Sequence, residues 1–379
     1  MSKTIQIVHE GPIFRNPMPG YEAKNAYYAN MAVISDDEIV CVNTIGQALY
    51  ALDRRLTLSR SLDGGRTWNE EGLIWDTAKD DRNYAYTLGW ITRLRDGSMV
   101  MATFRHERIE KDKIRHNPET GGLPPEQYVL MHSTDNGRTW TRPQLINYPP
   151  PGQPAGLDLC SPIVELADGR WLLPCNVWKA WDDPTPLHMK YHYLFSSDRG
   201  KTWGDRVNPP SASEKDKMYS HGRFMRMKDN RLCALQWAQA IGGQQSFDLH
   251  IEFGDPTGKT WTNPRPTGLP GESSWIEDCG DGCLIAIYTC RSSKRPGIYA
   301  AISEDDGKTW NMDNQLRLFD ATGREFFGLD HPPTYPASHD NVAYGMPCAK
   351  RLPCGDIMAH WWSTAACVTQ TRYARLQVK

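Results

Sequence analysis

SLDGGRTW, from Ser61 to Trp68, is the first of four octapeptides in which Ser, Asp, Gly, Thr and Trp occupy fixed places. The others are STDNGRTW (133–140), SSDRGKTW (196–203) and SEDDGKTW (303–310). A degenerate copy, DPTGKTW, ends at Trp261. Self-similarity of this kind is typical of repeat architectures, in which each repeat is one supersecondary unit. The chain is therefore expected to be an array of similar units.

A second repeat alternates with the octapeptide and consists of two apolar segments joined by a tight turn. The turn often contains Asp-Gly, which readily adopts the positive φ angles of a two-residue hairpin turn. Each copy is therefore expected to form a β-hairpin. The six copies are MAVISDDEIVCVNT (31–44), ITRLRDGSMVMATF (91–104), IVELADGRWLLPCNVW (163–178), FMRMKDNRLCALQWA (224–238), WIEDCGDGCLIAIYT (275–289) and MPCAKRLPCGDIMAHWW (346–362).

Together the two repeats describe a four-stranded unit, which is typical of a propeller blade. It contains the hairpin, a third strand that enters the octapeptide, and a fourth strand after the Trp. The sixth hairpin is followed only by TRYARLQVK (371–379), so the alternating N-terminal segment KTIQIVHEG (3–11) is predicted to supply its outer strand. The sequence thus predicts an all-β fold, a single six-bladed β-propeller over residues 1–379 whose ring is closed by the N-terminal strand. Two separate β domains are the alternative, but no linker separates any pair of repeats.

Composition excludes several classes of protein. The 379 residues are 39% hydrophobic and 23% charged, with a formal net charge of −2, which is typical of a soluble globular protein with a sizeable core. A nearly balanced charge provides no electrostatic attraction to nucleic acid or to an anionic membrane. No apolar run reaches the roughly 20 residues of a membrane span, and no secretory signal is visible. We therefore expect a cytoplasmic protein without nucleic-acid or membrane partners.

The cysteines are expected to be reduced thiols rather than metal ligands. Several lie within apolar segments, where a free thiol behaves as a small hydrophobic side chain. These are Cys41, Cys160, Cys175, Cys233 and Cys290. Cys279 and Cys283 flank one turn, and Cys348 and Cys354 bracket another, so hairpin disulfides are an alternative for these two pairs. None of the spacings gives the paired CxxC pattern of a zinc site.

The octapeptide is an Asp box, and over nearly its whole length the sequence resembles the sialidase (neuraminidase) superfamily. The residue types suit a turn, because the Asp carboxylate can accept hydrogen bonds from backbone N–H groups and Gly adopts the left-handed conformation at little cost. In sialidase-like propellers the boxes lie on the face opposite the active site. The resemblance therefore implies no catalytic role for the aspartates of the boxes, Asp63, Asp135, Asp198 and Asp305.

A propeller brings the starts of its innermost strands, and the loops after its second strands, together around the axis at one end. Arginines there could hold a planar carboxylate, and aromatic rings could cover the apolar faces of a sugar. The expected ligand is therefore a carbohydrate, with an acidic one favoured. The expected substrate-binding residues are Arg105, His106, Asp158, Trp178, Arg223, Trp237, Trp275, Arg291, Asp340 and Trp361. The expected catalytic residues are Asp53, Tyr219, His221 and His339.

Sialidases carry an early Phe-Arg-Ile-Pro motif, an arginine triad, an acidic residue in the first blade and a Tyr/Glu nucleophile pair. By resemblance, Arg291 matches the place of the last triad arginine and Asp53 lies near the place of the acid. YYANMAV (27–33) has no arginine at the position of the early motif, and PASHDN (336–341) has no tyrosine. His221 stands in the region that matches the glutamate. The chain is therefore not expected to be a typical sialidase.

Three functions remain open. The leading prediction is an exo-acting glycoside hydrolase for an acidic or modified sugar, which needs two carboxyl groups. The candidates for these are Asp53, Asp158, Asp330 and Asp340. The second is a uronate-cleaving lyase, in which arginine neutralises the carboxylate and His or Tyr transfers protons. Its candidates are His106, Tyr219, His221 and His339. The third is a non-catalytic propeller that binds glycans or proteins. Neither enzyme function needs an organic cofactor. A metal at the histidines is an alternative, but no HExxH-like spacing supports it, so no cofactor or metal is expected.

Overall fold

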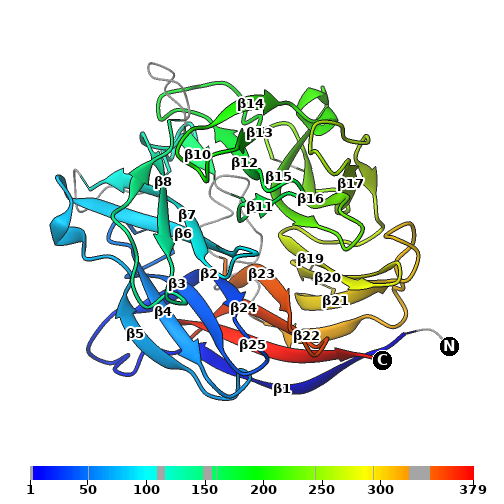
Figure 1. Ribbon diagram of the computed structural model, residues 1–379, viewed down its shortest axis with the longest axis horizontal. Coiled ribbons are helices and arrows are strands. Elements are labelled where there is room, and N and C mark those ends of the chain that lie inside the picture. The colour runs from blue at the N-terminus through cyan, green and yellow to red at the C-terminus, as the bar shows by residue number, and fades with distance from the viewer. Residues whose placement is uncertain are drawn as a thin grey trace.

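The computed structural model describes residues 3–49, 51–108, 116–147, 156–158, 160–243, 245–292, 294–323 and 342–379, and for 156–158 the backbone alone. Its strands form six antiparallel sheets around a common axis (Figure 1). This confirms the predicted six-bladed propeller. The helices of the described ranges are two short 3₁₀ turns, η1 (Thr77–Lys79) and η2 (Pro210–Ser213), and neither has the length and apolarity needed to cross a membrane.

The blades follow one another along the chain, and in each the strands run from the axis to the rim. Blade 1 contains β2 (Asn25–Val33), β3 (Ile39–Gly46), β4 (Arg55–Ser61) and β5 (Asn69–Leu73). Blade 2 contains β6 (Tyr84–Arg93), β7 (Met99–Glu107), β8 (Gln127–Ser133) and β9 (Gln144–Leu145). In blade 3 the innermost position is shared by β10 (Gly156–Asp158) and β11 (Val164–Glu165), followed by β12 (Trp171–Trp178), β13 (Lys190–Ser196) and β14 (Gly204–Val207).

The second half of the ring repeats this order. Blade 4 contains β15 (Lys217–Arg226), β16 (Leu232–Ala240), β17 (His250–Gly254) and β18 (Arg265–Pro266). Blade 5 contains β19 (Ser274–Gly280), β20 (Cys283–Cys290), β21 (Gly297–Ser303) and β22 (Leu316–Asp320). Blade 6 contains β23 (Tyr344–Arg351), β24 (Ile357–Ala365), β25 (Val368–Val378) and β1 (Ile5–Phe14).

Blade 6 is built from both ends of the chain, as predicted. β1 pairs antiparallel with β25, from Ile5 opposite Val378 to Phe14 opposite Thr371. Beyond the strands, Thr4 and Lys379 exchange two backbone hydrogen bonds of 2.9 and 3.0 Å. The two chain ends consequently lie close together at the rim (Figure 1). The N-terminal strand therefore closes the ring.

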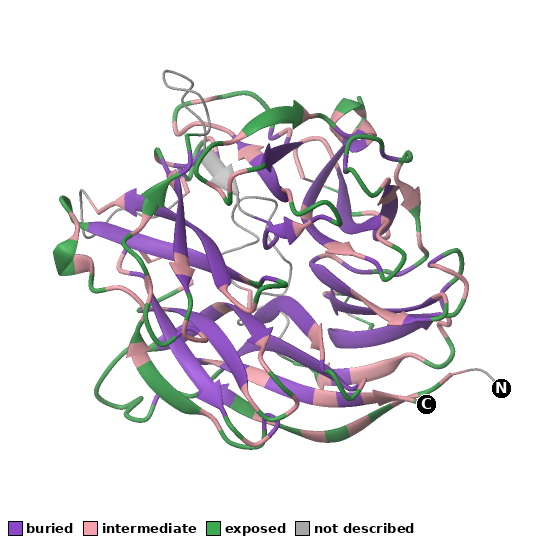
Figure 2. Ribbon diagram, viewed as in Figure 1, coloured by how far each residue is buried: buried purple, intermediate pink, exposed green. Residues whose placement is uncertain are grey.

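Burial decreases from the middle of each blade to its rim (Figure 2). Every residue of β20 and β21 is buried, whereas β5 and β9 are largely exposed. Strands in the middle of a blade are covered on both faces by the neighbouring blades, so they contain nearly continuous apolar runs. The apolar segments of the predicted hairpins thus form the contacts between blades.

All four Asp boxes form the same hydrogen-bonded turn. In the first, Asp63 accepts hydrogen bonds from the Ser61 hydroxyl (2.8 Å), the Thr67 N–H (2.9 Å) and the Thr67 hydroxyl (2.6 Å). The hydrogen bonds from Thr67 lower the pKa of Asp63 to about 2. Trp68 donates from Nε1 to the carbonyl oxygen of Gly65 (3.0 Å), whose φ is 90°. The same contacts recur around Asp135 and Asp198. Asp305 repeats the contacts with Ser and Thr, but Nε1 of Trp310 makes no hydrogen bond to the residues that the structure describes.

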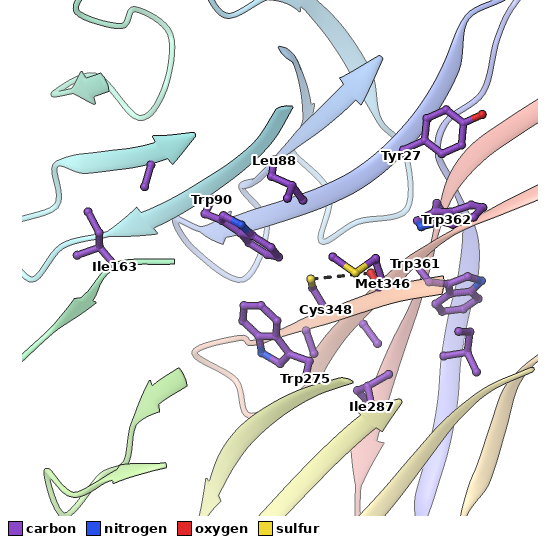
Figure 3. Packing of buried hydrophobic residues seen from close by; sticks show 14 of the residues in the cluster. Tyr27, Leu88, Trp90, Ile163, Trp275, Ile287, Met346, Cys348, Trp361 and Trp362 are labelled. Carbon is purple, nitrogen blue, oxygen red and sulfur yellow. Dashed lines mark hydrogen bonds between the residues drawn. The ribbon is translucent and has the colours of Figure 1, made fainter. Parts of the chain in front are cut away.

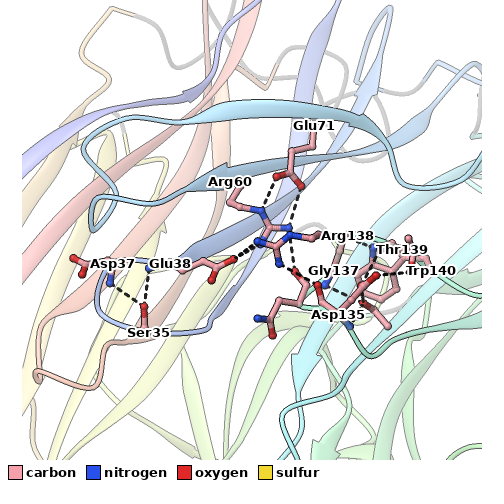
Figure 4. Close-up of polar contacts among 12 residues, drawn as sticks. Ser35, Asp37, Glu38, Arg60, Glu71, Asp135, Gly137, Arg138, Thr139 and Trp140 are labelled. Carbon is pink, nitrogen blue, oxygen red and sulfur yellow. Dashed lines mark hydrogen bonds and ion pairs between the residues drawn. The ribbon is translucent and has the colours of Figure 1, made fainter.

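The boxes also connect neighbouring blades (Figure 4). In blade 1, the Arg60 guanidinium forms ion pairs with Glu38 (2.7 Å) and Glu71 (2.6 Å). It also donates to the carbonyl oxygen of Asn136 (3.0 Å), within the Asp box of blade 2. The Arg60 side chain is only 3% exposed, so these charge-assisted hydrogen bonds are shielded from water. Arg60 therefore joins blade 1 to blade 2.

All ten cysteines belong to the described ranges, and all are free thiols, so neither hairpin disulfide is formed. The five cysteines predicted to lie in the core, Cys41, Cys160, Cys175, Cys233 and Cys290, are buried. Cys354 and Cys367 are exposed. Among the residues that the structure describes, no three His, Cys, Asp or Glu side chains come together in a way that could hold a metal ion.

One carboxyl group is buried inside blade 4. Glu252, in β17, has no exposed surface and accepts hydrogen bonds from the hydroxyls of Tyr193 (2.8 Å) and Ser211 (3.5 Å). Its second carboxyl oxygen, Oε2, makes no hydrogen bond to the residues that the structure describes. Burial raises the pKa of Glu252 to about 7, because the charged form loses its hydration. The group is thus held among neutral polar partners.

Candidate functional site

The Asp boxes and the turns of the inner hairpins lie at the same end of the propeller. For example, Arg199 in the third box forms an ion pair of 2.7 Å with Asp96 in the hairpin turn of blade 2. We call this end the lower face. The starts of the innermost strands and the ends of the second strands lie at the other end, the upper face, as the pairing of Tyr84 with Glu107 illustrates.

Four innermost strands contain the same backbone irregularity near the upper face. Their residues with positive φ, between 48° and 57°, are Tyr28, Leu88, His221 and Met346. Each lies in a register shift relative to the second strand of its blade. Positive φ strains a bulky side chain and is found most often at functional sites, and a bulge redirects the side chain. The upper face is therefore the candidate site, and His221 contributes an imidazole to it.

Two of the predicted ligand residues, Arg223 and Trp275, are buried at the axis. Trp90 and Trp275 stack with their ring centroids 6.2 Å apart (Figure 3). The guanidinium of Arg223 lies 4.7 Å from the centroid of Trp90, donates to the carbonyl oxygen of Cys160, and is 3.5 Å from the sulfur of Met346. The Arg223 residue is only 1% exposed. These side chains form an axial plug, defined as Trp90, Arg223, Trp275 and Met346.

A cavity of about 620 Å³ opens between blades 4 and 5 at the upper face. Arg291, which follows β20, lies in its wall. The guanidinium is ion-paired with Glu272, also in the wall, and donates to the carbonyl oxygen of Tyr344 (2.7 Å). Lys217 lines the same cavity, with its ammonium 5.8 Å from the ring centroid of Phe247. A volume of this size lies within the range of small-molecule sites. We call it the blade 4/5 cavity.

Two aromatic pairs of blade 4 border this cavity. The His221 ring stacks on Trp237 with centroids 5.7 Å apart and 17° between the planes. Trp237 donates from Nε1 to the hydroxyl of Ser246 (3.1 Å), which lines the cavity. Tyr219 packs edge-to-face against His250, with centroids 5.6 Å apart. The structure therefore brings four predicted residues, Tyr219, His221, Trp237 and Arg291, to one region of the upper face.

His250 adds a basic nitrogen that the sequence analysis did not predict. Its Nδ1 lies 2.9 Å from the carbonyl oxygen of Asp248. Because a carbonyl only accepts, Nδ1 carries the hydrogen and Nε2 of the neutral ring retains its lone pair. Burial lowers the pKa of His250, so the ring is neutral at pH 7, and burial raises the pKa of Tyr219. The pair thus combines a proton acceptor and a proton donor.

Arg105 and His106 belong to a separate cluster in blade 2. The Arg105 guanidinium lies 3.9 Å from the centroid of Tyr84, donates to Gln127 (2.9 Å), and is 3.7 Å from Asp80. His106 is buried beside it in β7. The structure thus separates these two residues from the blade 4/5 cavity, although they face the same end of the propeller.

The remaining predicted residues are dispersed. Asp53 lies in blade 1, where it accepts a hydrogen bond from the Gln47 N–H (3.2 Å). Trp178 and Trp361 are buried core residues, and the backbone of Asp158 pairs with that of Asn176 in blade 3. Three of the predicted site residues, Asp330, His339 and Asp340, lie outside the described ranges.

The sequence analysis missed four charged or basic residues of the cavity wall: Lys217, Asp248, His250 and Glu272. Lys217 begins β15 and Glu272 shortly precedes β19, so the rule of inner-strand starts could have found both. Asp248 and His250 lie at the start of a third strand, which that rule leaves out. The cavity lies between two blades and away from the axis. Residues at the start of a third strand can therefore line it.

Comparison with solved structures places the chain among sialidase-like propellers. A protein of unknown function from Dyadobacter fermentans DSM 18053 has a TM-score of 0.73 at 19% identity, over 99% of this chain and 100% of that one. The Hadza microbial sialidase Hz136 has a TM-score of 0.67 at 14% identity, over 96% and 68%. The intramolecular trans-sialidase of Ruminococcus gnavus has a TM-score of 0.61 at 12% identity, over 96% of each chain. At these identities the likeness concerns the fold.

Sequence comparison defines the family. A search of the curated proteins finds no significant match. The family profile of the BNR repeat-like domain matches residues 114–326, which is more than half of the chain. This segment contains three of the repeated octapeptides and most of blades 2 to 5. The chain therefore belongs to the BNR repeat-like domain family.

Proposed function

We propose that the chain is an exo-acting carbohydrate-cleaving enzyme whose blade 4/5 cavity binds a terminal acidic or modified sugar. The observation that carries this proposal is the placement of Arg291. Glu272 and the Tyr344 carbonyl orient its guanidinium, and 15% of the side chain is exposed at the cavity wall. A planar guanidinium so oriented can bind a carboxylate through two parallel hydrogen bonds.

The remaining walls suit the rest of an acidic sugar. Lys217 adds a second cation and Phe247 a ring surface, and the stacked His221–Trp237 pair lies behind Ser246 of the wall. Such a ring surface can cover the apolar face of a pyranose, and the polar groups around it can bind the sugar hydroxyls. The Ruminococcus gnavus trans-sialidase, which has the same fold, was solved with oseltamivir carboxylate, and this supports an acidic ligand.

Hydrolysis is the reaction that we propose first. One carboxylic acid protonates the leaving oxygen, and a second carboxylate acts as nucleophile or activates water. Asp248 and Glu272 are the carboxyl groups of the cavity wall. The Asp248 side chain makes no hydrogen bond to the other residues described. Asp53 remains the acid suggested by the sequence, but it lies in blade 1. The cleavage rates of Asp248→Asn and Asp53→Asn should be compared. The variant with the larger loss identifies whether the carboxyl group in the cavity wall or the one in blade 1 acts as the acid.

Elimination from a uronic acid is the second candidate, and the Tyr219–His250 pair favours it. Arg291 would neutralise the sugar carboxylate, and His250 Nε2 would take the proton from C5. The electron pair left at C5 forms a C4–C5 double bond as the C4–O bond breaks, and Tyr219 protonates the leaving oxygen. This reaction consumes no water.

Cleavage in water enriched in heavy oxygen tests the proposal and separates the two reactions. Hydrolysis of acidic oligosaccharides places heavy oxygen in one product, whereas elimination places none and generates ultraviolet absorbance from the double bond. Labelled products would support hydrolysis, and an unsaturated, unlabelled product would replace it with elimination. If acidic glycans bind in an Arg291-dependent manner but are never cleaved, the enzyme proposal is wrong and the chain is a glycan-binding propeller.

A further inference from the structure

A second cavity, of about 510 Å³, lies on the axis at the lower face. All six innermost positions contribute to its wall through β2, β6, β11, β15, β19 and β23. Its apolar lining includes Met31, Ile91, Ile163 and Phe224. Lys350 also lines it, and the Lys350 ammonium lies 4.6 Å from the ring centroid of Trp275, so the cavity borders the axial plug. We call it the lower cavity.

Basic side chains outnumber acidic ones in this wall. The basic residues are Arg93, Arg95, Arg226, Lys228 and Lys350. The acidic residues are Glu165, Glu277 and Asp278. Basic residues come from blades 2, 4 and 6, whose innermost strands lie on different sides of the axis (Figure 1). Positive charge therefore approaches the cavity from several directions.

The acidic groups already have partners. Glu165 pairs with Arg95 (3.4 Å), and Glu277 lies 3.7 Å from Lys350. Asp278 accepts hydrogen bonds from backbone N–H groups, of 2.7 Å and 2.6 Å. Two of the three acidic groups are thus paired with cations of the wall, whereas Asp278 accepts hydrogen bonds from neutral N–H groups and keeps its charge.

Three cations of the wall lack an acidic partner among the residues that the structure describes. Arg226 donates to the amide oxygen of Asn230 (2.7 Å), and the Lys228 ammonium is 3.5 Å from the carbonyl oxygen of Cys279. Arg93 is exposed and makes no hydrogen bond or ion pair within the described ranges. A cleft lined by charges of one sign concentrates ligands of the opposite sign. The unpaired charge therefore favours an anion.

We propose that the lower cavity binds a small organic anion, a phosphate or sulfate ester. Its oxyanion would be bound by Arg93, Arg226 and Lys228, and its organic part would lie against the apolar lining. Guanidinium groups bind tetrahedral oxyanions through paired, charge-assisted hydrogen bonds. An ester suits the cavity better than a free ion, because the volume is that of a small-molecule site and part of the wall is apolar. The site lies at the opposite end of the axis from the blade 4/5 cavity and does not depend on the proposed reaction.

Calorimetric titration of the whole chain at constant ionic strength tests this site. The probes are phenyl phosphate, phenyl sulfate, inorganic phosphate and the neutral phenyl glucoside. Both esters, or one of them, should bind saturably and at least about tenfold more tightly than inorganic phosphate, and the neutral probe should not compete. The better of the two esters identifies the natural class of anion.

Variants assign the binding to the lower cavity. Arg93→Gln alone, and together with Arg226→Gln, should weaken ester binding by about tenfold or more. Arg142→Gln, an exposed arginine outside the cavity, is the matched control and should change nothing. Because Arg93 is exposed, its single variant is expected to fold even if the double variant does not. Unchanged ester affinity in a folded Arg93→Gln protein, or no saturable binding by the wild type, overturns the proposal.

Discussion

Glu252→Gln is expected to stabilise the protein at pH 8 and to change its stability little at pH 5. Glutamine has the shape of a protonated glutamic acid. Its oxygen can accept the hydrogen bond that Tyr193 now donates. The substitution therefore preserves the contacts of the protonated side chain inside blade 4 and removes only its ability to ionise.

The magnitude follows from the two pKa values of the carboxyl group. The ordinary value, 4.5, applies to the unfolded chain, and burial raises the pKa to about 7 in the folded protein. Between these values the unfolded chain has released its proton while the folded protein still retains it, so rising pH favours unfolding. The difference corresponds to about 3 kcal/mol of unfolding free energy, fully lost above pH 7 and regained below pH 4.5. Glutamine does not titrate and avoids this loss.

Urea unfolding at pH 5, 6, 7 and 8, followed by tryptophan fluorescence, measures the effect. The variant should exceed the wild type by about 2–3 kcal/mol at pH 8, with the difference shrinking towards pH 5. Burial lowers the pKa of His360 to about 3, but this acts equally in both proteins and cancels in the comparison. Glu70→Gln, at an exposed position, is the control. A difference that stays constant across this pH range would refute the reasoning.

The other predictions concern the Asp boxes and the upper face. Asp135→Ala removes the acceptor of two hydrogen bonds from Thr139 and should cost about 1–3 kcal/mol, lowering the melting temperature while turnover per folded molecule stays near wild type. A stable but inactive protein would contradict our placement of the boxes away from the site. Arg291→Lys keeps the charge but loses the planar fork, so acidic oligosaccharides should bind about tenfold more weakly in calorimetry. An equal loss for neutral analogues would remove the case for a carboxylate clamp. His250→Gln should slow cleavage about 100-fold or more without changing ligand affinity, if His250 transfers a proton. The pH dependence of the cleavage rate should show one ionisation fewer in the variant than in the wild type, and an unchanged pH profile would exclude that role.

The architecture could be predicted from the sequence because its determinants are local. Ser61, Asp63 and Thr67 of the first box contact one another within seven residues, so the octapeptide specifies its own turn. The alternating segment that becomes β1 was recognisable because the sixth blade lacked an outer strand. The number of blades then followed from counting the repeated hairpins.

The site was less predictable because it depends on backbone irregularities and on contacts between blades. The bulges at Leu88 and His221 change the direction of the side chains. Gly89 and Gly222 lie within these bulges, but a glycine in a strand does not by itself specify which way the neighbouring side chains point. Trp178, Trp237 and Trp361 are all buried. Trp237 differs in its hydrogen bond to Ser246 in the cavity wall, and sequence spacing does not reveal that contact. Arg223 lies at the axis as expected, but its packing over Trp90 arises between strands of blades 2 and 4, which are not adjacent in the ring.

The pairing of β1 with β25 makes the two ends of the polypeptide interdependent. Loop-closure entropy grows only slowly with chain length, so bringing such distant segments together costs little more than closing a much shorter loop. During synthesis, however, β1 emerges first and must wait for the last strand, exposing its hydrogen-bonding edge meanwhile. A second copy in the same condition offers the same partner, so exchange of β1 between copies is the natural misassembly of this ring. The strand that completes the propeller is thus also the element through which two chains could become entangled.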